Sequence, residues 1–112
     1  MAFTTATVFR IEQGTKQFQG MFSEMWAATL TVDPSSIAAG GEDTATFTIP
    51  GVALGDVIIG YSCGVNQTVD ADINIFVSAA NTITARISNL NAASGLDLAT
   101  STWRVVIGRM SF

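Results

Sequence analysis

The stretch that decides the fold is DINIFVSAANTITARIS, residues 72–88. Apolar residues alternate with polar or small ones in residues 72–77 and again in residues 82–88, which is the period of a half-buried β-strand. Residues 78–81 have the length of a hairpin loop, and Asn81 is a residue type that adopts a positive φ at little cost. The stretch therefore predicts two antiparallel strands joined by a tight turn.

Strand patterns continue on both sides of this hairpin. Residues 44–49 alternate in the same way and end at the turn dipeptide Pro50-Gly51. Residues 56–61, DVIIGY, form a continuous β-branched run, which predicts a strand covered on both faces. Residues 103–109, WRVVIGR, close the series as another strand. The short spacing between strands predicts an all-β protein, an antiparallel β-sandwich of jelly-roll or immunoglobulin-like size.

The first half of the chain is less regular. Residues 22–32, FSEMWAATLTV, suit a strand or a short helix, and the alternation in residues 28–32 favours the strand. Residues 34–41 are expected to form a loop with room for one helical turn. Residues 1–20 have no strong periodicity, so we expect an N-terminal arm at 1–20 and a β-sandwich domain at 21–112. The alternative for the arm is an edge strand of the same domain.

Composition favours a protein that works in an assembly. The chain has 112 residues, enough for one domain, and 48% of them are hydrophobic while 12% are charged. So few charged side chains leave much of a monomer's surface apolar. This predicts that copies or partners bury part of the surface, and we expect a homotrimer. Aromatic residues outside the regular β pattern are the candidate contacts between chains: Phe3, Phe9, Phe18, Phe22 and Trp26.

Charge argues against two classes of partner. The net charge is −4, and the five basic residues are spread along the chain without a cluster. Nucleic-acid binding needs concentrated Lys and Arg, and an acidic chain is repelled by an anionic membrane. The first residues, MAFTTATVFRIEQG, lack the features of a signal peptide, and no apolar run is long enough to span a bilayer. We therefore expect a soluble protein with no nucleic-acid or membrane partner, made in a reducing cytoplasm.

The residues that usually carry catalysis are missing or isolated. The chain has no histidine, and its one cysteine, Cys63, has no basic neighbour in sequence that would lower the thiol pKa. Two acid pairs remain, Asp70 with Asp72 and Glu42 with Asp43. Either pair suits weak cation binding or acid–base chemistry, but acids at strand starts more often form turns. We predict no enzyme activity, no catalytic residues, no metal and no cofactor.

Three stretches, in order, carry a resemblance: residues 50–60, PGVALGDVIIG, residues 76–88, FVSAANTITARIS, and residues 97–107, DLATSTWRVVI. Together they resemble a module of tailed-phage virion structural proteins, particularly those of cyanophages and related environmental phages. The resemblance covers roughly residues 43–107 and brings no catalytic motif with it. It implies a virion part with a β-sandwich body, made in the host bacterial cytoplasm.

The composition of the chain and the resemblance together lead to one expected function. We expect a non-enzymatic capsid decoration (cement) protein that binds the outer surface of the major capsid protein lattice, where many weak contacts act together. One alternative is a tail, fibre or adaptor component of the same virion. A further alternative is a carbohydrate- or receptor-binding module, which would use exposed aromatic rings or the polar loop NLNAASGLD, residues 89–97.

Overall fold

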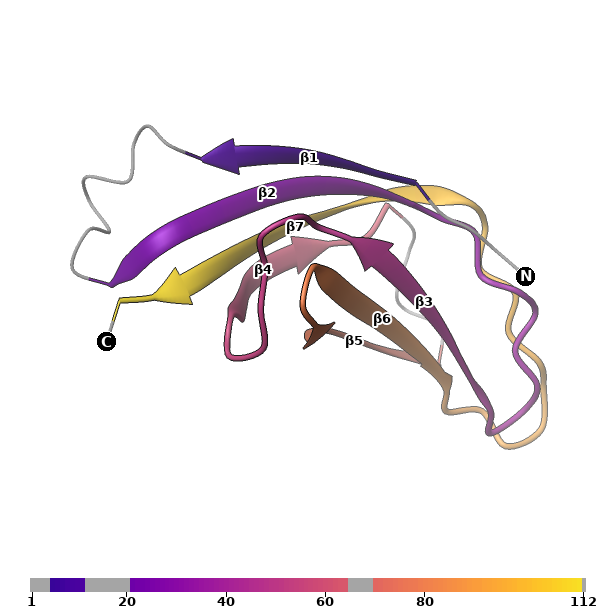
Figure 1. The fold of residues 1–112 in the computed structure, drawn as a ribbon. Coiled ribbons are helices and arrows are strands. Elements are labelled where there is room, and N and C mark those ends of the chain that lie inside the picture. The colour runs from indigo at the N-terminus through magenta and orange to yellow at the C-terminus, as the bar shows by residue number, and fades with distance from the viewer. Residues whose placement is uncertain (1–4, 12–20, 65–69, 112) are drawn as a thin grey trace.

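A computed structural model describes residues 5–11, 21–64 and 70–111 of the chain. Its described residues contain seven β-strands and no helix (Figure 1). None of these elements is a helix that could cross a membrane. The strands are β1 (Thr5–Ile11), β2 (Phe22–Val32), β3 (Glu42–Thr48), β4 (Val57–Ser62), β5 (Ala71–Ala79), β6 (Thr82–Asn89) and β7 (Ser101–Met110).

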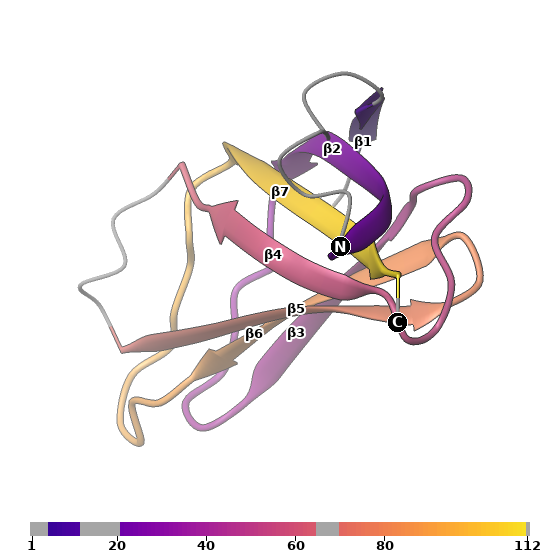
Figure 2. The ribbon, with the colours of Figure 1, turned by 90° about the vertical axis from the view of Figure 1, so that its left-hand side faces the viewer.

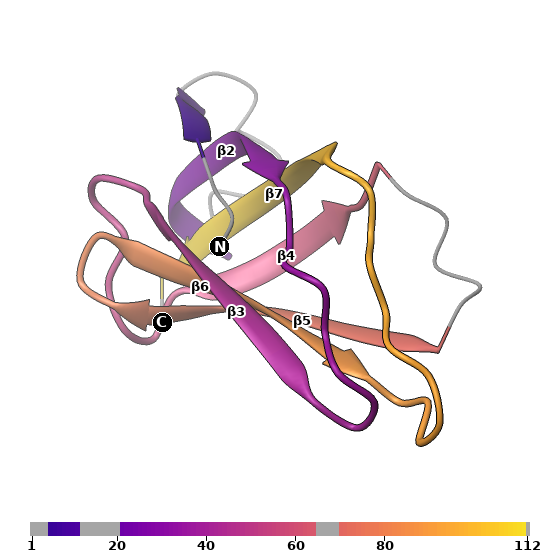
Figure 3. The ribbon, with the colours of Figure 1, turned by 90° about the vertical axis from the view of Figure 1, so that its right-hand side faces the viewer.

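The strands form two antiparallel sheets that pack face to face. The first sheet, here sheet A, has the order β1-β2-β7-β4, and the second, sheet C, has the order β3-β6-β5. Figures 2 and 3 show the two layers from opposite ends. The predicted all-β antiparallel sandwich is therefore confirmed. The C-terminal strand β7 lies between β2 and β4, which are far apart in the sequence.

Sheet C forms where the sequence alternates most cleanly. The β5–β6 hairpin pairs Ile73 with Ile87 and Ile75 with Ala85, and all four side chains are buried. Asn81 occupies the turn with a φ of 60°, as the sequence predicts. Its backbone and its side chain also bond the segment after β3: Asn81 N donates to Val52 O, and Gly51 N donates to Asn81 Oδ1. The hairpin turn thereby holds the connection that leads into β4.

The core lies between the sheets and is built from alternate residues of five strands, β2, β3, β5, β6 and β7, together with residues of the connecting segments. β2 contributes a continuous row because every second residue from Trp26 to Val32 points inward. β7 lies beside it in register, with Trp26 opposite Ile107 and Leu30 opposite Trp103. The other core residues in strands are Phe47, Ile73, Ile75, Val77, Ile83, Ala85, Ile87 and Val105, and connecting segments add Ile37, Ile49, Val52 and Leu98.

Two expectations about the elements are wrong. The run at residues 56–61 was expected to be covered on both faces, but β4 is the edge strand of sheet A, and Ile59 and Tyr61 are exposed. No helical turn forms within residues 33–41, where Ile37 instead makes a β-bridge with Leu96. Residues 22–32 form a strand throughout, since they pair with β7 from Phe22 to Val32 and with β1 from Met25 to Thr31.

Part of the expected N-terminal arm belongs to the sheet. β1 pairs antiparallel with β2, from Thr5 opposite Thr31 to Ile11 opposite Met25. This is the edge-strand alternative, and the sandwich therefore includes Thr5–Ile11 as well as residues after position 20. The rest of the proposed arm lies outside the described residues.

Candidate interaction surface

Sheet A carries apolar side chains on its outer face as well as on its inner one. Strand alternation sends Met25 and Ala27 of β2 outward, and the register sets them opposite Gly108 and Val106 of β7. Val57 of β4 lies opposite Gly108 from the other side. We call this surface the outer apolar face; its members are Phe22, Met25, Ala27, Val57, Ile59, Val106, Gly108 and Met110.

Gly108 is the packing centre of the outer apolar face. A Cβ added there would lie 2.7 Å from Cδ1 of Phe22 and 2.8 Å from Cδ1 of Ile59. The glycine therefore leaves the space that these two side chains occupy. Ile59 reaches this position because it is the extra residue of a β-bulge, between Ile58 opposite Ile107 and Gly60 opposite Val106.

The outer apolar face is only partly covered within the described chain. Met25 is 7% exposed although it does not belong to the core between the sheets. Ile59 is 44% exposed and Met110 is 40% exposed. Exposed neighbouring apolar side chains are typical of surfaces that contact another protein.

Charge is absent from this part of sheet A's outer face. In the described strands β2, β4 and β7, one outward-facing side chain is charged, Arg104. It lies opposite Thr29 of β2 and Ser62 of β4, away from Phe22 and Met110. The outer face of sheet A thus has an apolar half, next to the start of β2, and a polar half.

The outer face of sheet C has the opposite character. Its outward residues are Glu42, Thr44, Thr46 and Thr48 of β3, Thr82, Thr84, Arg86 and Ser88 of β6, and Asp72, Asn74, Phe76 and Ser78 of β5. Phe76 is the one large apolar side chain among them. Its ring is covered by the Arg86 guanidinium, whose Cζ lies 5.1 Å from the ring centroid. Sheet C therefore turns a polar face to the outside.

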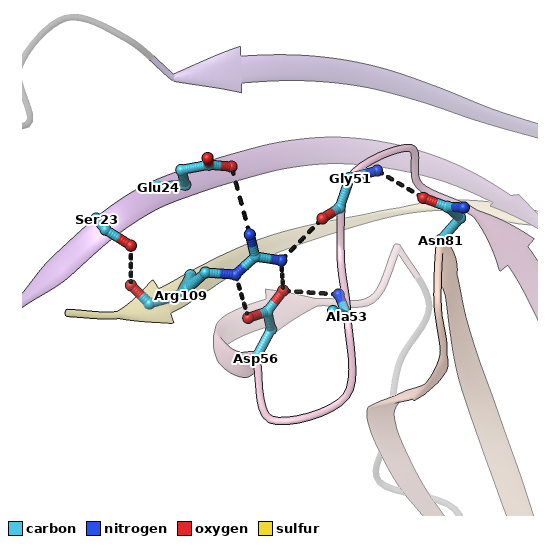
Figure 4. A network of polar contacts seen from close by, with 7 residues as sticks. All are labelled: Ser23, Glu24, Gly51, Ala53, Asp56, Asn81 and Arg109. Carbon is cyan, nitrogen blue, oxygen red and sulfur yellow. Dashed lines mark hydrogen bonds and ion pairs between the residues drawn. The ribbon is translucent and has the colours of Figure 1, made fainter. Parts of the chain in front are cut away.

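A polar network lies on the inner side of sheet A, behind the outer apolar face (Figure 4). Arg109 Nε donates to Asp56 Oδ1 at 2.9 Å, and its Nη2 donates to Asp56 Oδ2 at 3.0 Å and to Gly51 O at 2.9 Å. Asp56 also accepts a hydrogen bond from Ala53 N at 2.8 Å, and its side chain is only 4% exposed. This bidentate pair fixes the segment before β4 against the end of β7.

Two further groups complete the surroundings of Arg109. A carboxylate oxygen of Glu24 lies 3.9 Å from Nη1, and the guanidinium Cζ lies 5.3 Å from the centroid of the Trp26 ring. The hydrogen bond to Asp56 raises the pKa of Arg109, and the charges of Asp56 and Glu24 act in the same direction, while burial opposes them. Arg109 thus lies between two carboxylates on the inner side of the sheet.

The five predicted contact residues have different positions. Phe3 and Phe18 lie outside the described residues, as does the side chain of Phe9, whose backbone pairs with Ala27 in β1. Phe22 belongs to the outer apolar face. The prediction for Trp26 is wrong, because its side chain is 2% exposed and packs in the core. Sequence reasoning missed Ile59 because the run at residues 56–61 was expected to be covered on both faces, and it missed Met110 because the last strand was expected to end at Arg109.

Three acids of the two pairs, Asp43, Asp70 and Glu42, have polar partners in the structure. Asp43 Oδ2 accepts a hydrogen bond from Ser35 N, and Oδ1 accepts one from Thr44 N. Asp70 accepts a hydrogen bond from the Asn91 side chain. Glu42 lies 3.7 Å from Arg86 across the β3–β6 pair. No group of three or more potential metal-ligating side chains occurs within residues 5–11, 21–64 and 70–111.

Cys63 is a half-buried thiol at the end of β4 that packs against the core. Burial raises its pKa from 9.0 to about 11. The thiol therefore keeps its proton at neutral pH, whereas a nucleophilic or metal-binding cysteine needs a lowered pKa.

The side chains of Asn89 and Asn91 in the polar loop at residues 89–97 form hydrogen bonds with backbone groups of the chain. The buried Asn89 side chain donates to Ile37 O, Ala38 O and Ser94 O. Asn91 Oδ1 accepts from Ala93 N and Ser94 N. Tyr61 is the one aromatic among the large exposed apolar side chains of the described residues, and its hydroxyl donates to Ile73 O of β5. These groups join segments of the chain to one another.

No family model, curated protein or solved structure matches this chain. The candidate surface therefore has to be judged from its own residues. Its distinguishing features are the exposed apolar side chains around Gly108, the charges paired on the inner side, and the polar outer face of sheet C.

Proposed function

We propose that this chain is a non-enzymatic structural protein of a phage virion, and specifically a capsid decoration (cement) protein that binds the outer surface of the major capsid protein lattice. The observation that carries the proposal is the difference between the two outer faces of the sandwich. A polar face suits water, and an apolar face with exposed Ile59 and Met110 suits a protein neighbour. A sandwich with one face of each kind is fitted to lie within an assembly.

The sequence resemblance supports the choice of a virion. Residues 50–60 form the connection held by Arg109 and the first half of β4, residues 76–88 form most of the β5–β6 hairpin, and residues 97–107 lead into β7. A decoration protein acting as a homotrimer would bind the lattice through several copies at once, so that weak single contacts add up to stable attachment. Its location is then the virion, and its partners are its own copies and the major capsid protein.

The chemistry of the described side chains supports a role without catalysis. The acid pairs that sequence analysis considered form loop bonds at Asp43 and Asp70, and the Cys63 thiol is protonated at neutral pH. Neither group is poised as a base or a nucleophile.

The test uses particles of a phage from which the gene for this chain has been deleted. Purified chain is added to these particles and, as a control, to intact particles whose sites are already filled. We expect saturable binding to the deleted particles alone, and electron cryomicroscopy should show added density on the outer capsid surface. Density on the tail would instead support the tail, fibre or adaptor alternative, and no binding to either structure would contradict a virion role.

A further inference from the structure

We infer that the outer apolar face of sheet A is the surface by which copies of this chain contact one another. This inference deepens the proposed function and rests on its claim that the protein works as an assembly of copies. It assigns a particular surface to that assembly, which the expected contact residues Phe3, Phe9, Phe18, Phe22 and Trp26 did not locate.

The first argument is the lack of charge on the surface. Two copies, each with a net charge of −4, repel one another unless the surfaces that meet are free of charge. A charged group in a contact between copies needs an opposite charge placed against it, whereas apolar side chains pack against any apolar surface of another copy. The outer apolar face meets this condition, since Glu24, Asp56 and Arg109 pair with one another on the opposite side of the sheet.

The second argument concerns the alternative of edge-to-edge pairing. An exposed edge strand such as β4 could add a strand of another copy, but a bulge at Ile59 interrupts its regular pairing geometry. The Tyr61 hydroxyl also ties β4 to β5 by its hydrogen bond to Ile73 O. The edge of β4, which borders the outer apolar face, is therefore poorly suited to adding a strand of another copy, and the outer face beside it is the better contact surface.

The third argument is the lack of polar groups that would select a different partner. Specific surfaces for a foreign protein combine apolar residues with polar groups that fix the register. Around Gly108 the outer positions carry Phe22, Met25, Val57, Ile59 and Met110. Methionine and isoleucine side chains fill gaps against a similar apolar surface, and the copy of this face is such a surface.

Gly60 gives a sharp experimental probe. It lies outward beside Val106, and a Cβ added there meets no atom within 4 Å. The variant Gly60→Glu therefore adds a charge to the outer face without an internal clash at its Cβ. Met110→Glu is the second variant, and Thr46→Glu is the matched control because Thr46 is an exposed strand residue on the polar outer face of sheet C.

The experiment measures the mass of the full chain by sedimentation over a micromolar concentration range. We expect the wild type to form a defined oligomer, a multiple of the 11.7 kDa chain and three times that mass for a trimer. Gly60→Glu and Met110→Glu should weaken self-association by at least about tenfold, and Thr46→Glu should leave it unchanged. Circular dichroism and thermal melting confirm that each variant is folded.

Three results would overturn the inference: a monomeric wild type, equal weakening by Thr46→Glu, or an oligomer unaffected by both face variants. Binding to the gene-deleted particles, measured in parallel, separates this inference from the proposed function. A wild type that forms the oligomer through this face but binds no particle supports the inference and contradicts the virion role. A monomeric wild type whose particle binding is lost in Gly60→Glu shows that the particle, and not a copy, covers the face.

Discussion

Sheet A and sheet C share one core but turn different surfaces to the outside. The outward residues of sheet C are polar, with Phe76 covered by Arg86. The outward residues of sheet A around Gly108 are apolar, and their nearest charges are paired on the inner side. The two outer faces of the sandwich therefore differ in polarity, and only that of sheet C is polar over its whole extent. The outer face of one sheet is polar, while that of the other leaves Ile59 and Met110 exposed.

The same difference explains the incorrect expectation for β4. A continuous apolar run indicates that both faces of a strand are apolar, and in a single-chain fold this usually means that both are covered. In this structure the cover is missing on one side of β4. The pattern of residues 56–61 is thus informative about the chemistry of the two faces, and a second copy is the cover that we propose.

The largest expected effect comes from removing the network behind the apolar face. Asp56→Ala removes a buried carboxylate and leaves the Arg109 guanidinium and Ala53 N without their partner. We expect the free energy of unfolding to fall by about 3 kcal/mol, because the three hydrogen bonds that the charged Asp56 carboxylate accepts are lost. Denaturant unfolding measures this loss, and Asp72→Ala, an exposed acid on the outer face of sheet C, is the control. Similar losses in both variants would contradict the contrast between the sheets.

A smaller loss is expected from filling the packing centre of the outer apolar face. In Gly108→Ala the new Cβ must displace Phe22 and Ile59, and overpacking of this kind lowers the free energy of unfolding by about 1–3 kcal/mol. Gly60→Ala has open space and should instead raise it by about 0.5–1 kcal/mol. Thermal melting of the two variants side by side tests the difference. If both variants melt at the same temperature, the packing around Gly108 is looser than the distances indicate.

A pH effect is expected where sheet A approaches sheet C at the end of β4. The Cys63 pKa is raised by burial from 9.0 to about 11, so the folded protein holds this proton more tightly than the unfolded chain does. The contribution is fully present below pH 9 and is lost as the pH rises to about 11. The wild type should therefore lose stability relative to Cys63→Ala across this window. Parallel pH curves for the two proteins would show that the thiol is not buried in solution.

The smallest effect is expected for the ion pair on the outer face of sheet C. Glu42 and Arg86 are 3.7 Å apart, and both side chains are largely exposed. Removing such a pair by Glu42→Ala should change the free energy of unfolding by about 0–1 kcal/mol. Denaturant unfolding at low and high salt measures the change. A loss as large as that of Asp56→Ala would mean that sheet C also depends on charge pairing.

Sheet C could be predicted from the sequence because local alternation decides its strands. Residues 72–77 and 82–88 were placed within the bounds of β5 and β6, and Asn81 was placed in the turn. The same rule could have placed Trp26 in the core, because the inward row Ala28, Leu30 and Val32 extends back to it by two residues. The alternation that predicts a strand at residues 28–32 therefore also predicts an inward position for Trp26.

Sheet A could not be predicted in the same way because its order depends on distant segments. Arg109 and Asp56 are 53 residues apart, and no local pattern indicates that they meet. The placement of β7 between β2 and β4 decides which residues surround Gly108, and this follows from packing of the whole chain. The outer apolar face is therefore a product of tertiary structure, although each of its residues is visible in the sequence.

The central position of β7 also orders events during synthesis. The ribosome makes Ser101–Met110 after the other six described strands, yet β7 is the strand that joins β2 to β4. The β5–β6 hairpin can pair as soon as it emerges, and β2 can pair with β1, but the other edge of β2 has no partner until β7 is made. Met25, Val57 and Gly108 thus come together only once β7 has been made. Until β7 has been made, a growing chain therefore carries no complete outer apolar face.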